Sequence, residues 1–257
     1  MFLFLFACQH NISIGSPPSD DPSSNWATVI KEVSTVDGVD YEALQKRRTE
    51  LEEYLAWVGD NGPRMNRRKN IRWRKRDREN KKIAFYANAY NAWVLYSILE
   101  TLPRDTVEEI HLKSSGLFPT AFLIDGEYMS LTHVKEERLL GDFQEPLINI
   151  MLFDGSRSSP PLRFWGTEQF DIVLKNQFER YLNSPQGIQH HKGEIELPAL
   201  FENRINDFID WSLSDSLCEY LMNYSLKHKI NWEKEAQKGC TISYRPYDWT
   251  LAAESKN

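Results

Sequence analysis

The chain has few cysteines, no long apolar run and no excess of positive charge. Only three cysteines occur in 257 residues, and the net charge of −6 argues against general nucleic-acid binding. After the first few residues, no run approaches the ~18 apolar residues of a membrane span. A glycine-rich phosphate loop and a dinucleotide fingerprint are also missing, so we expect no cofactor.

The positions of Cys218, Cys240 and the histidine pair give little support for a metal site or for a particular disulfide. Cys218 and Cys240 are candidates for a disulfide, but sequence alone does not give their separation. Cys218 lies in a helical pattern, which favours a buried thiol. His190 and His191 are consecutive and would point apart on a strand, so we expect no metal.

The positive charge is concentrated in one basic stretch. From Arg64 to Lys82 there are eleven basic and two acidic residues, so this stretch carries +9 and the rest of the chain −15. One interpretation is a surface that binds lipid headgroups or another anionic partner. The alternative, which we favour, is a solvated arm, because Ile71 and Trp73 alone do not make an apolar face.

The first residues suggest a lipid anchor. The apolar run from Met1 to Ala7 ends at Cys8, and L-F-A-C resembles the lipobox of bacterial lipoproteins, although the run is short and lacks basic residues. The Ser-, Pro- and Asp-rich residues that follow are typical of a flexible tether. The expected location is the bacterial cell envelope, with lipidation at Cys8; otherwise the chain is soluble.

Apolar periodicity predicts an α+β fold that is mostly helical. Helices are expected after a cap at Asp40 and over residues 83–99, 131–140, 166–183, 200–211 and 216–226. Hairpins are expected around Asp125-Gly126 and Lys192-Gly193, with a buried strand at residues 146–152 and an edge strand at 241–247. No regular βαβ alternation appears, so we predict a central buried helix on a small antiparallel sheet.

The predicted central helix, residues 83–99, carries two amides that need partners. Asn88 and Asn91 fall on one side with small alanines, and an unpaired buried amide costs ~1–3 kcal/mol. These amides either orient a catalytic side chain or clamp a loop, or else they simply hold neighbouring backbone. The physics alone favours the last alternative.

A polar loop follows the predicted strand. From Phe153 to Trp165 the sequence is F-D-G-S-R-S-S-P-P-L-R-F-W, in which the two prolines fix φ and remove two backbone donors. A strand end that opens into hydroxyl groups and one arginine is a common place for chemistry. Such serines are more often only part of a loop.

Five motifs in order resemble the domain-of-unknown-function 547 family. They are A-F-Y-A-N-A-Y-N-A at Ala84, I-D-G-E-x-M-S-L at Ile124, S-R-S-S-P-P-L-R at Ser156, L-P-A-L-F-E-N-R-I-N-D-F at Leu197 and Y-D-W at Tyr247. The usual pattern of that family is Cys-x-x-x-x-Cys-Pro-Pro-Leu in the loop and Ile-Glu-His on the helix after the hairpin. This resemblance implies a papain-like thiol hydrolase site.

This sequence departs from that pattern where the chemistry would occur. Asp154 and Ser159 stand at the two cysteine positions, and Glu136 stands at the histidine position. A serine hydroxyl needs an adjacent base, and a carboxylate is a poor one unless burial raises its pKa. His133, three residues before Glu136 on the same helical face, is the alternative base, with Asp154 or Asn88 orienting its ring.

We therefore expect binding rather than catalysis. The leading hypothesis is a catalytically degenerate member with a pocket for a small-molecule or peptide ligand, in which Asn91, Arg157 and Ser159 contribute to binding. The alternative is an active peptide or amide hydrolase that uses Ser159 with His133 or Glu136. The expected organisation is a signal remnant and tether at 1–25, a helical region with the basic arm at 26–82, and the family core at 83–250.

Overall fold

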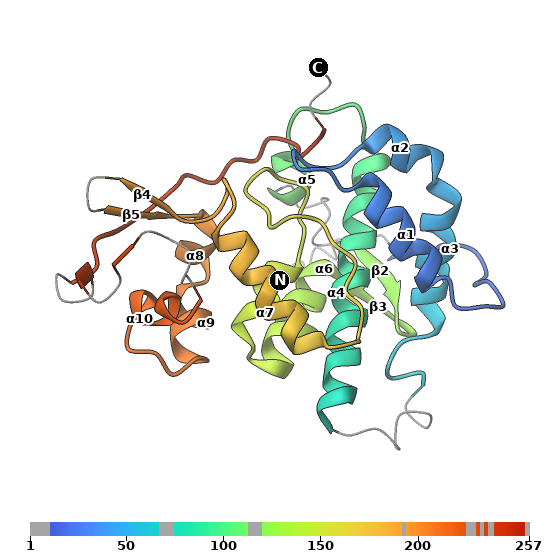
Figure 1. The fold of residues 1–257 in the computed structure, drawn as a ribbon. Coiled ribbons are helices and arrows are strands. Elements are labelled where there is room, and N and C mark those ends of the chain that lie inside the picture. Colours follow the sequence, from blue (N-terminus) through green and yellow to red (C-terminus); the bar gives the residue numbers. More distant parts are fainter. Residues whose placement is uncertain are drawn as a thin grey trace, which may run out of the picture.

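The computed structural model describes residues 11–66, 75–112, 120–191, 194–224, 230–231, 234–235 and 239–254. Cys8, the centre of the basic stretch and the Lys192-Gly193 turn lie outside these residues. Within them the fold is α+β, as predicted, with helices dominating two small sheets (Figure 1).

The central helix α4 (Lys75–Leu99) organises the core. From Ile83 to Leu95 all but one of its side chains are buried, so the prediction of a central buried helix is confirmed. The helix also includes the end of the basic stretch, from Lys75 to Lys82. It packs against α3 (Arg48–Asp60) and against η1, a π-helix over Val134–Gly141.

The N-terminal helices cover one flank of α4. They are α1 (Ser23–Val33), α2 (Tyr41–Lys46) and α3. Asp40 caps α2 as predicted, because its side chain accepts a hydrogen bond from the Ala43 N–H at 2.9 Å. The single helix expected after Asp40 is instead two helices that meet at Arg47.

The first sheet has the order β1-β2-β3. The hairpin of β2 (Ala121–Ile124) and β3 (Glu127–Ser130) is confirmed, with Asp125 and Gly126 both at positive φ, as a type I′ turn requires. β1 (Asn11–Ile12) lies in the segment predicted to be a flexible tether, but it pairs in parallel with β2. The sheet is therefore mixed rather than purely antiparallel.

The second sheet has the order β4-β5-β6. β4 (Gln189–His191) and β5 (Glu194–Leu197) form the second predicted hairpin, and β6 (Ile242–Tyr244) is the expected edge strand, parallel to β5. The helices beside this sheet are α7 (Phe170–Leu182), α8 (Ala199–Asn203), α9 (Ile205–Asp210) and α10 (Leu217–Met222). Two short helices, α5 (Glu108–Leu112) and α6 (Leu131–His133), complete the fold.

Two further sequence-based predictions are wrong. The segment expected as a strand at residues 146–152 is η2, a 3-10 helix over Pro146–Met151, all of whose residues are buried. A short apolar run does not distinguish a strand from a buried helical turn, and here Pro146 and a cap from Glu145 to the Leu147 N–H begin a helix.

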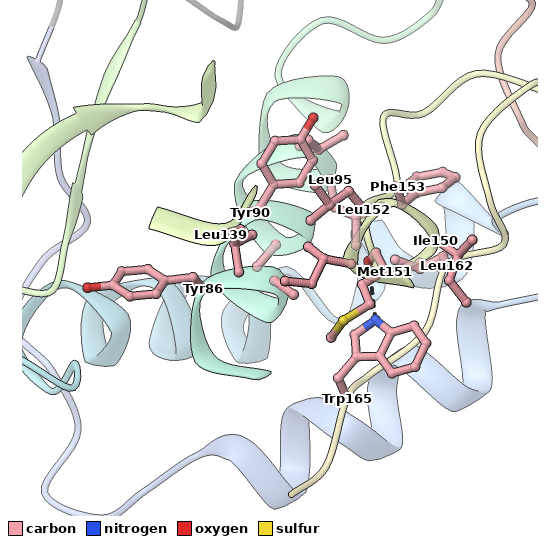
Figure 2. Packing of buried hydrophobic residues seen from close by; sticks show 14 of the residues in the cluster. Tyr86, Tyr90, Leu95, Leu139, Ile150, Met151, Leu152, Phe153, Leu162 and Trp165 are labelled. Carbon is pink, nitrogen blue, oxygen red and sulfur yellow. Dashed lines mark hydrogen bonds between the residues drawn. The ribbon is translucent and has the colours of Figure 1, made fainter. Parts of the chain in front are cut away.

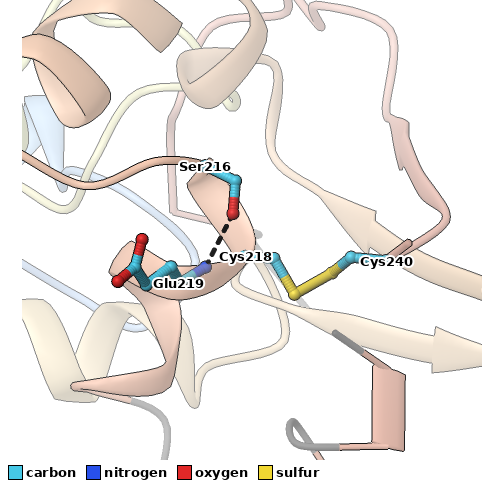
Figure 3. Close-up of a disulfide and its surroundings, with 4 residues drawn as sticks. All are labelled: Ser216, Cys218, Glu219 and Cys240. Atoms are coloured by element: carbon cyan, nitrogen blue, oxygen red, sulfur yellow. Dashed lines mark hydrogen bonds between the residues drawn. A yellow bond between two sulfur atoms is a disulfide. The ribbon is translucent and has the colours of Figure 1, made fainter. Parts of the chain in front are cut away.

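The second wrong prediction is the buried thiol at Cys218. Cys218 and Cys240, which are 22 positions apart in the sequence, form a disulfide that joins α10 to the chain just before β6 (Figure 3). The Ser216 side chain caps α10 beside it by accepting the Glu219 N–H at 3.2 Å.

Candidate functional site

The loop from Phe153 to Trp165, here called the serine loop, is held at its first end by Asn91. The Asn91 Nδ2 donates to the Met151 carbonyl at 2.9 Å, and the Phe153 N–H donates to Asn91 Oδ1 at 2.8 Å. Asn91 is only 3% exposed. Its amide thus replaces, for one residue pair, the hydrogen bonds that a neighbouring strand would supply.

Asn88 holds the other end of the serine loop in the same way. Its Nδ2 donates to the Trp165 carbonyl at 2.9 Å, and the Trp165 N–H donates to Asn88 Oδ1 at 2.8 Å. The Trp165 indole N–H then donates to the Met151 carbonyl at 3.2 Å, which joins the two ends of the loop (Figure 2). The sequence leaves open whether these two amides orient a catalytic side chain or hold loop backbone. In the structure both amides hydrogen-bond the backbone of the serine loop, and neither orients a catalytic ring.

The outer part of the serine loop is held by the C-terminal segment. The Tyr247 hydroxyl donates to Asp154 Oδ2, and the Ser156 hydroxyl donates to Tyr247 at 3.0 Å. The Asp248 N–H donates to the Ser158 hydroxyl at 2.7 Å. Burial first, and then the Asp154 charge, raise the pKa of Tyr247, which keeps its hydroxyl a donor.

Backbone pairing continues this contact beyond Tyr247. The Arg157 N–H donates to the Thr250 carbonyl at 2.9 Å, and the Ala252 N–H donates to the Gly155 carbonyl at 2.8 Å. Gly155 has φ of +89°, and a Cβ there would lie 2.4 Å from Ile98 Cδ1. A side chain at position 155 would therefore be strained by the positive φ and would force the Ile98 side chain or the loop to shift.

Ser159 serves the serine loop itself. Its hydroxyl accepts the Asp154 N–H at 2.9 Å and donates to the Pro160 carbonyl at 3.2 Å, and the residue is 4% exposed. In the described part of the chain, no histidine or carboxylate side chain hydrogen-bonds this hydroxyl. The hydroxyl therefore lacks the adjacent base that a serine nucleophile requires.

The Glu136 carboxylate forms a salt bridge with Arg204. Arg204 Nη1 lies 3.1 Å from both carboxylate oxygens of Glu136, and Arg204 Nε lies 2.6 Å from Asp207 Oδ2. Asp207 also accepts the Asn149 side-chain amide at 3.0 Å. The carboxylate at the family's histidine position thus belongs to a structural ion-pair network.

His133 is half-buried at the end of α6, where its backbone N–H donates to the Ser130 hydroxyl at 3.1 Å. No hydrogen bond joins its imidazole to Ser159 among the described residues. The pair that would make the alternative hydrolase site is therefore not assembled in this structure.

The charges of Asp154 and Glu136 nevertheless act on the same two side chains, Tyr90 and Lys135. Burial, followed by the charges of Asp154 and Glu136, raises the pKa of Tyr90. Burial, followed by the charge of Arg204, lowers the pKa of Lys135, while Glu136 and Asp154 act in the opposite direction. The two positions at which the family resemblance implies a Cys and a His, Asp154 and Glu136, thus act on a shared tyrosine and lysine.

Among the described residues, two of the cavities adjoin the serine loop, and Trp165 lines both of them. The larger, of about 640 Å³, opens between the N-terminal helices and α4, with Trp57, Phe85 and Phe164 among its walls. Asp21 and Lys81 also line it. The smaller, of about 270 Å³, lies between the serine loop and α7.

Arg157, expected as the cation of the pocket, is exposed and lines neither cavity. Hydrogen bonds from Thr250, and to a smaller degree the Arg157 charge, lower the pKa of Asp248.

Two described arginines of the basic stretch form ion pairs. Arg64 pairs with Glu127, and Arg76 contacts Asp171 of α7 at 2.5 Å.

In the described segments, no group of three or more His, Cys, Asp or Glu side chains is arranged to hold a metal ion. None of the helices in those segments is long and apolar enough to cross a membrane.

The fold and this loop define an α+β protein whose central helix clamps a polar loop through two asparagines. Residues 74–182 match the family described as "Protein of unknown function, DUF547", and this part of the chain belongs to that family. The match contains α4, the first hairpin and the serine loop, whereas the motifs at Leu197 and Tyr247 lie beyond it. No curated protein and no solved structure matches the chain.

No signal in the sequence indicates that the Y-D-W motif at Tyr247 contacts the serine loop. The two segments are 91 residues apart between Ser156 and Tyr247. The Y-D-W motif and the serine loop are both among the motifs that resemble the family, but this does not indicate that they are in contact.

We predict that Asn91→Leu destabilises the protein by about 3 kcal/mol, because it leaves the Phe153 N–H buried without an acceptor and removes a donor to Met151. Urea unfolding followed by circular dichroism measures the loss. The matched control is Asn176→Leu on the exposed face of α7, which should change stability by no more than about 0.5 kcal/mol. Equal losses in the two variants would contradict the clamp.

Proposed function

We propose that this chain is a non-catalytic binding protein built on the DUF547 fold. The observation that carries the proposal is that both groups at the hydrolase positions are already engaged. The Ser159 hydroxyl is hydrogen-bonded within its own loop, and Glu136 is paired with Arg204. A serine without a base and a carboxylate without a nucleophile do not support acyl transfer.

The serine loop then acts as a rigid wall for ligand binding. Its two ends are fixed by α4 and its middle by the C-terminal segment, which is the kind of preorganisation that lowers the entropic cost of binding. The cavities of about 640 and 270 Å³ beside Trp165 have space for a small molecule or for part of a peptide. An active peptide or amide hydrolase remains the alternative.

A serine-directed fluorophosphonate tests the proposal directly, because it labels only a serine activated by a neighbouring base. We expect no labelling of Ser159 in the intact protein, as measured by mass spectrometry of tryptic peptides. The control variants are Ser159→Ala and Ser158→Ala, which remove neighbouring hydroxyls from the same loop. Labelling that disappears in Ser159→Ala but persists in Ser158→Ala would overturn the proposal and favour the hydrolase.

We further propose that the protein acts at the bacterial cell envelope, anchored by a lipid on Cys8. The L-F-A-C sequence that ends at Cys8 supports this location. The disulfide between Cys218 and Cys240 also supports it, since disulfides persist in oxidising compartments such as the periplasm and are rare in the cytosol.

Metabolic labelling with an alkyne fatty acid tests the anchor in cells that express the natural gene. The wild-type chain should carry the label and sediment with membranes, while Cys8→Ala should lose both properties. An unlabelled wild-type chain, or a label that survives in Cys8→Ala, would contradict the anchor at this residue.

A further inference from the structure

The cavity of about 270 Å³ between the serine loop and α7 contains two arginines. Its apolar walls include Ile150, Leu162 and Trp165, and Arg163 and Arg180 supply its charged groups. Arg163 follows the two prolines of the serine loop, whereas Arg180 lies on the last turns of α7.

The Arg163 side chain has a buried hydrogen-bond donor without an acceptor. Its guanidinium lies 5.8 Å from the centre of the Trp165 ring, which supports one face of the cation. Its Nε is fully buried and has no hydrogen-bond partner in the described residues. A buried donor that is left unpaired costs free energy, so an acceptor supplied by a ligand would be favoured.

Arg180 adds a second positive charge instead of neutralising the first. Burial, followed by the Arg180 charge, lowers the pKa of Arg163, and no carboxylate acts on Arg163 in the opposite direction. Neither guanidinium forms an ion pair with any described acidic residue. Glu179, the residue before Arg180 on α7, does not line this cavity; together with Arg180 it lines a neighbouring one.

We propose that this cavity binds a small organic carboxylate. The planar guanidinium fork of Arg163 matches the two oxygens of a carboxylate, with Arg180 as the second cation at the exposed edge. The apolar walls suit the hydrocarbon part of the ligand, which an inorganic anion lacks. The inference names a ligand class for one of the cavities of the proposed binding function, and so it rests on that function.

The carboxylate has two sources with the same chemistry, a free acid and the C-terminus of a peptide. The probes are therefore 3-phenylpropionate and N-acetyl-Ala-Phe, each compared with its neutral amide, and inorganic phosphate. Binding to the full chain is followed through the ¹⁵N signals of the Trp165 indole N–H and the Arg163 Nε–H, which both border the cavity.

We expect at least one of the two acids to bind, and its amide to bind about tenfold more weakly or not at all. Binding of N-acetyl-Ala-Phe, with or without binding of 3-phenylpropionate, assigns the site to peptide C-termini, and binding of 3-phenylpropionate alone assigns it to free acids. Equal affinity for acid and amide, stronger binding of phosphate than of either acid, or no saturable shift with either acid would overturn the inference.

Three variants locate the binding site. Arg163→Gln and Arg180→Gln should each weaken acid binding by about tenfold. Arg157→Gln, which removes the same charge from an exposed position in the same loop, should change binding by less than about twofold. If Arg163→Gln does not fold, Arg180→Gln still tests the site, because Arg180 is exposed. Unchanged affinity in Arg180→Gln would overturn the inference.

Failure here differs from failure of the proposed function. A labelled Ser159 together with selective acid binding would overturn the absence of catalysis alone. An unlabelled Ser159 without acid binding would overturn the carboxylate site alone.

Discussion

The structure depends on two buried amides that pair with loop backbone. Asn88 and Asn91 are three residues apart on the same face of α4, so their side chains reach the two ends of one loop. In an apolar helix each amide would cost ~1–3 kcal/mol if left unpaired, and the loop ends would also lose their partners. Helix and loop therefore stabilise each other, and separating them exposes unpaired groups on both.

This constraint explains why the polar groups of the serine loop are structural. A loop fixed at both ends must satisfy its own donors and acceptors, and Ser159 and Asp154 do so inside the loop and with Tyr247. Hydroxyl and carboxylate groups suit this role because they form strong hydrogen bonds. Asp154, Ser159 and Glu136 stand where the family resemblance implies two thiols and an imidazole, so those groups are missing here. Glu136 is instead paired with Arg204.

The sequence predicted the local elements with strong signals. The central helix, the Asp125-Gly126 hairpin and the cap at Asp40 follow from periodicity or from turn chemistry within a few residues. It also identified Asn88 and Asn91 as buried amides that need partners. The 3-10 helix over Pro146–Met151 was predicted as a strand, because its side chains are buried on all sides and leave no period to detect.

The parts that the sequence did not predict depend on distant contacts. Whether Cys218 and Cys240 pair depends on where α10 and β6 lie relative to each other. The contact between Tyr247 and Asp154 spans 93 residues, and the cavity with Arg163 and Arg180 forms only when the serine loop lies against α7. Local propensity carries no information about contacts between residues far apart in the sequence, so only the tertiary structure defines this site.

Amide hydrogen exchange of the native protein, resolved by NMR, tests the two clamps most directly. We predict that the Phe153 and Trp165 N–H groups, which donate to Asn91 and Asn88, exchange as slowly as the buried amides of α4. Exchange of these two amides at the rate of exposed loop residues would contradict the claim that α4 holds the serine loop in place.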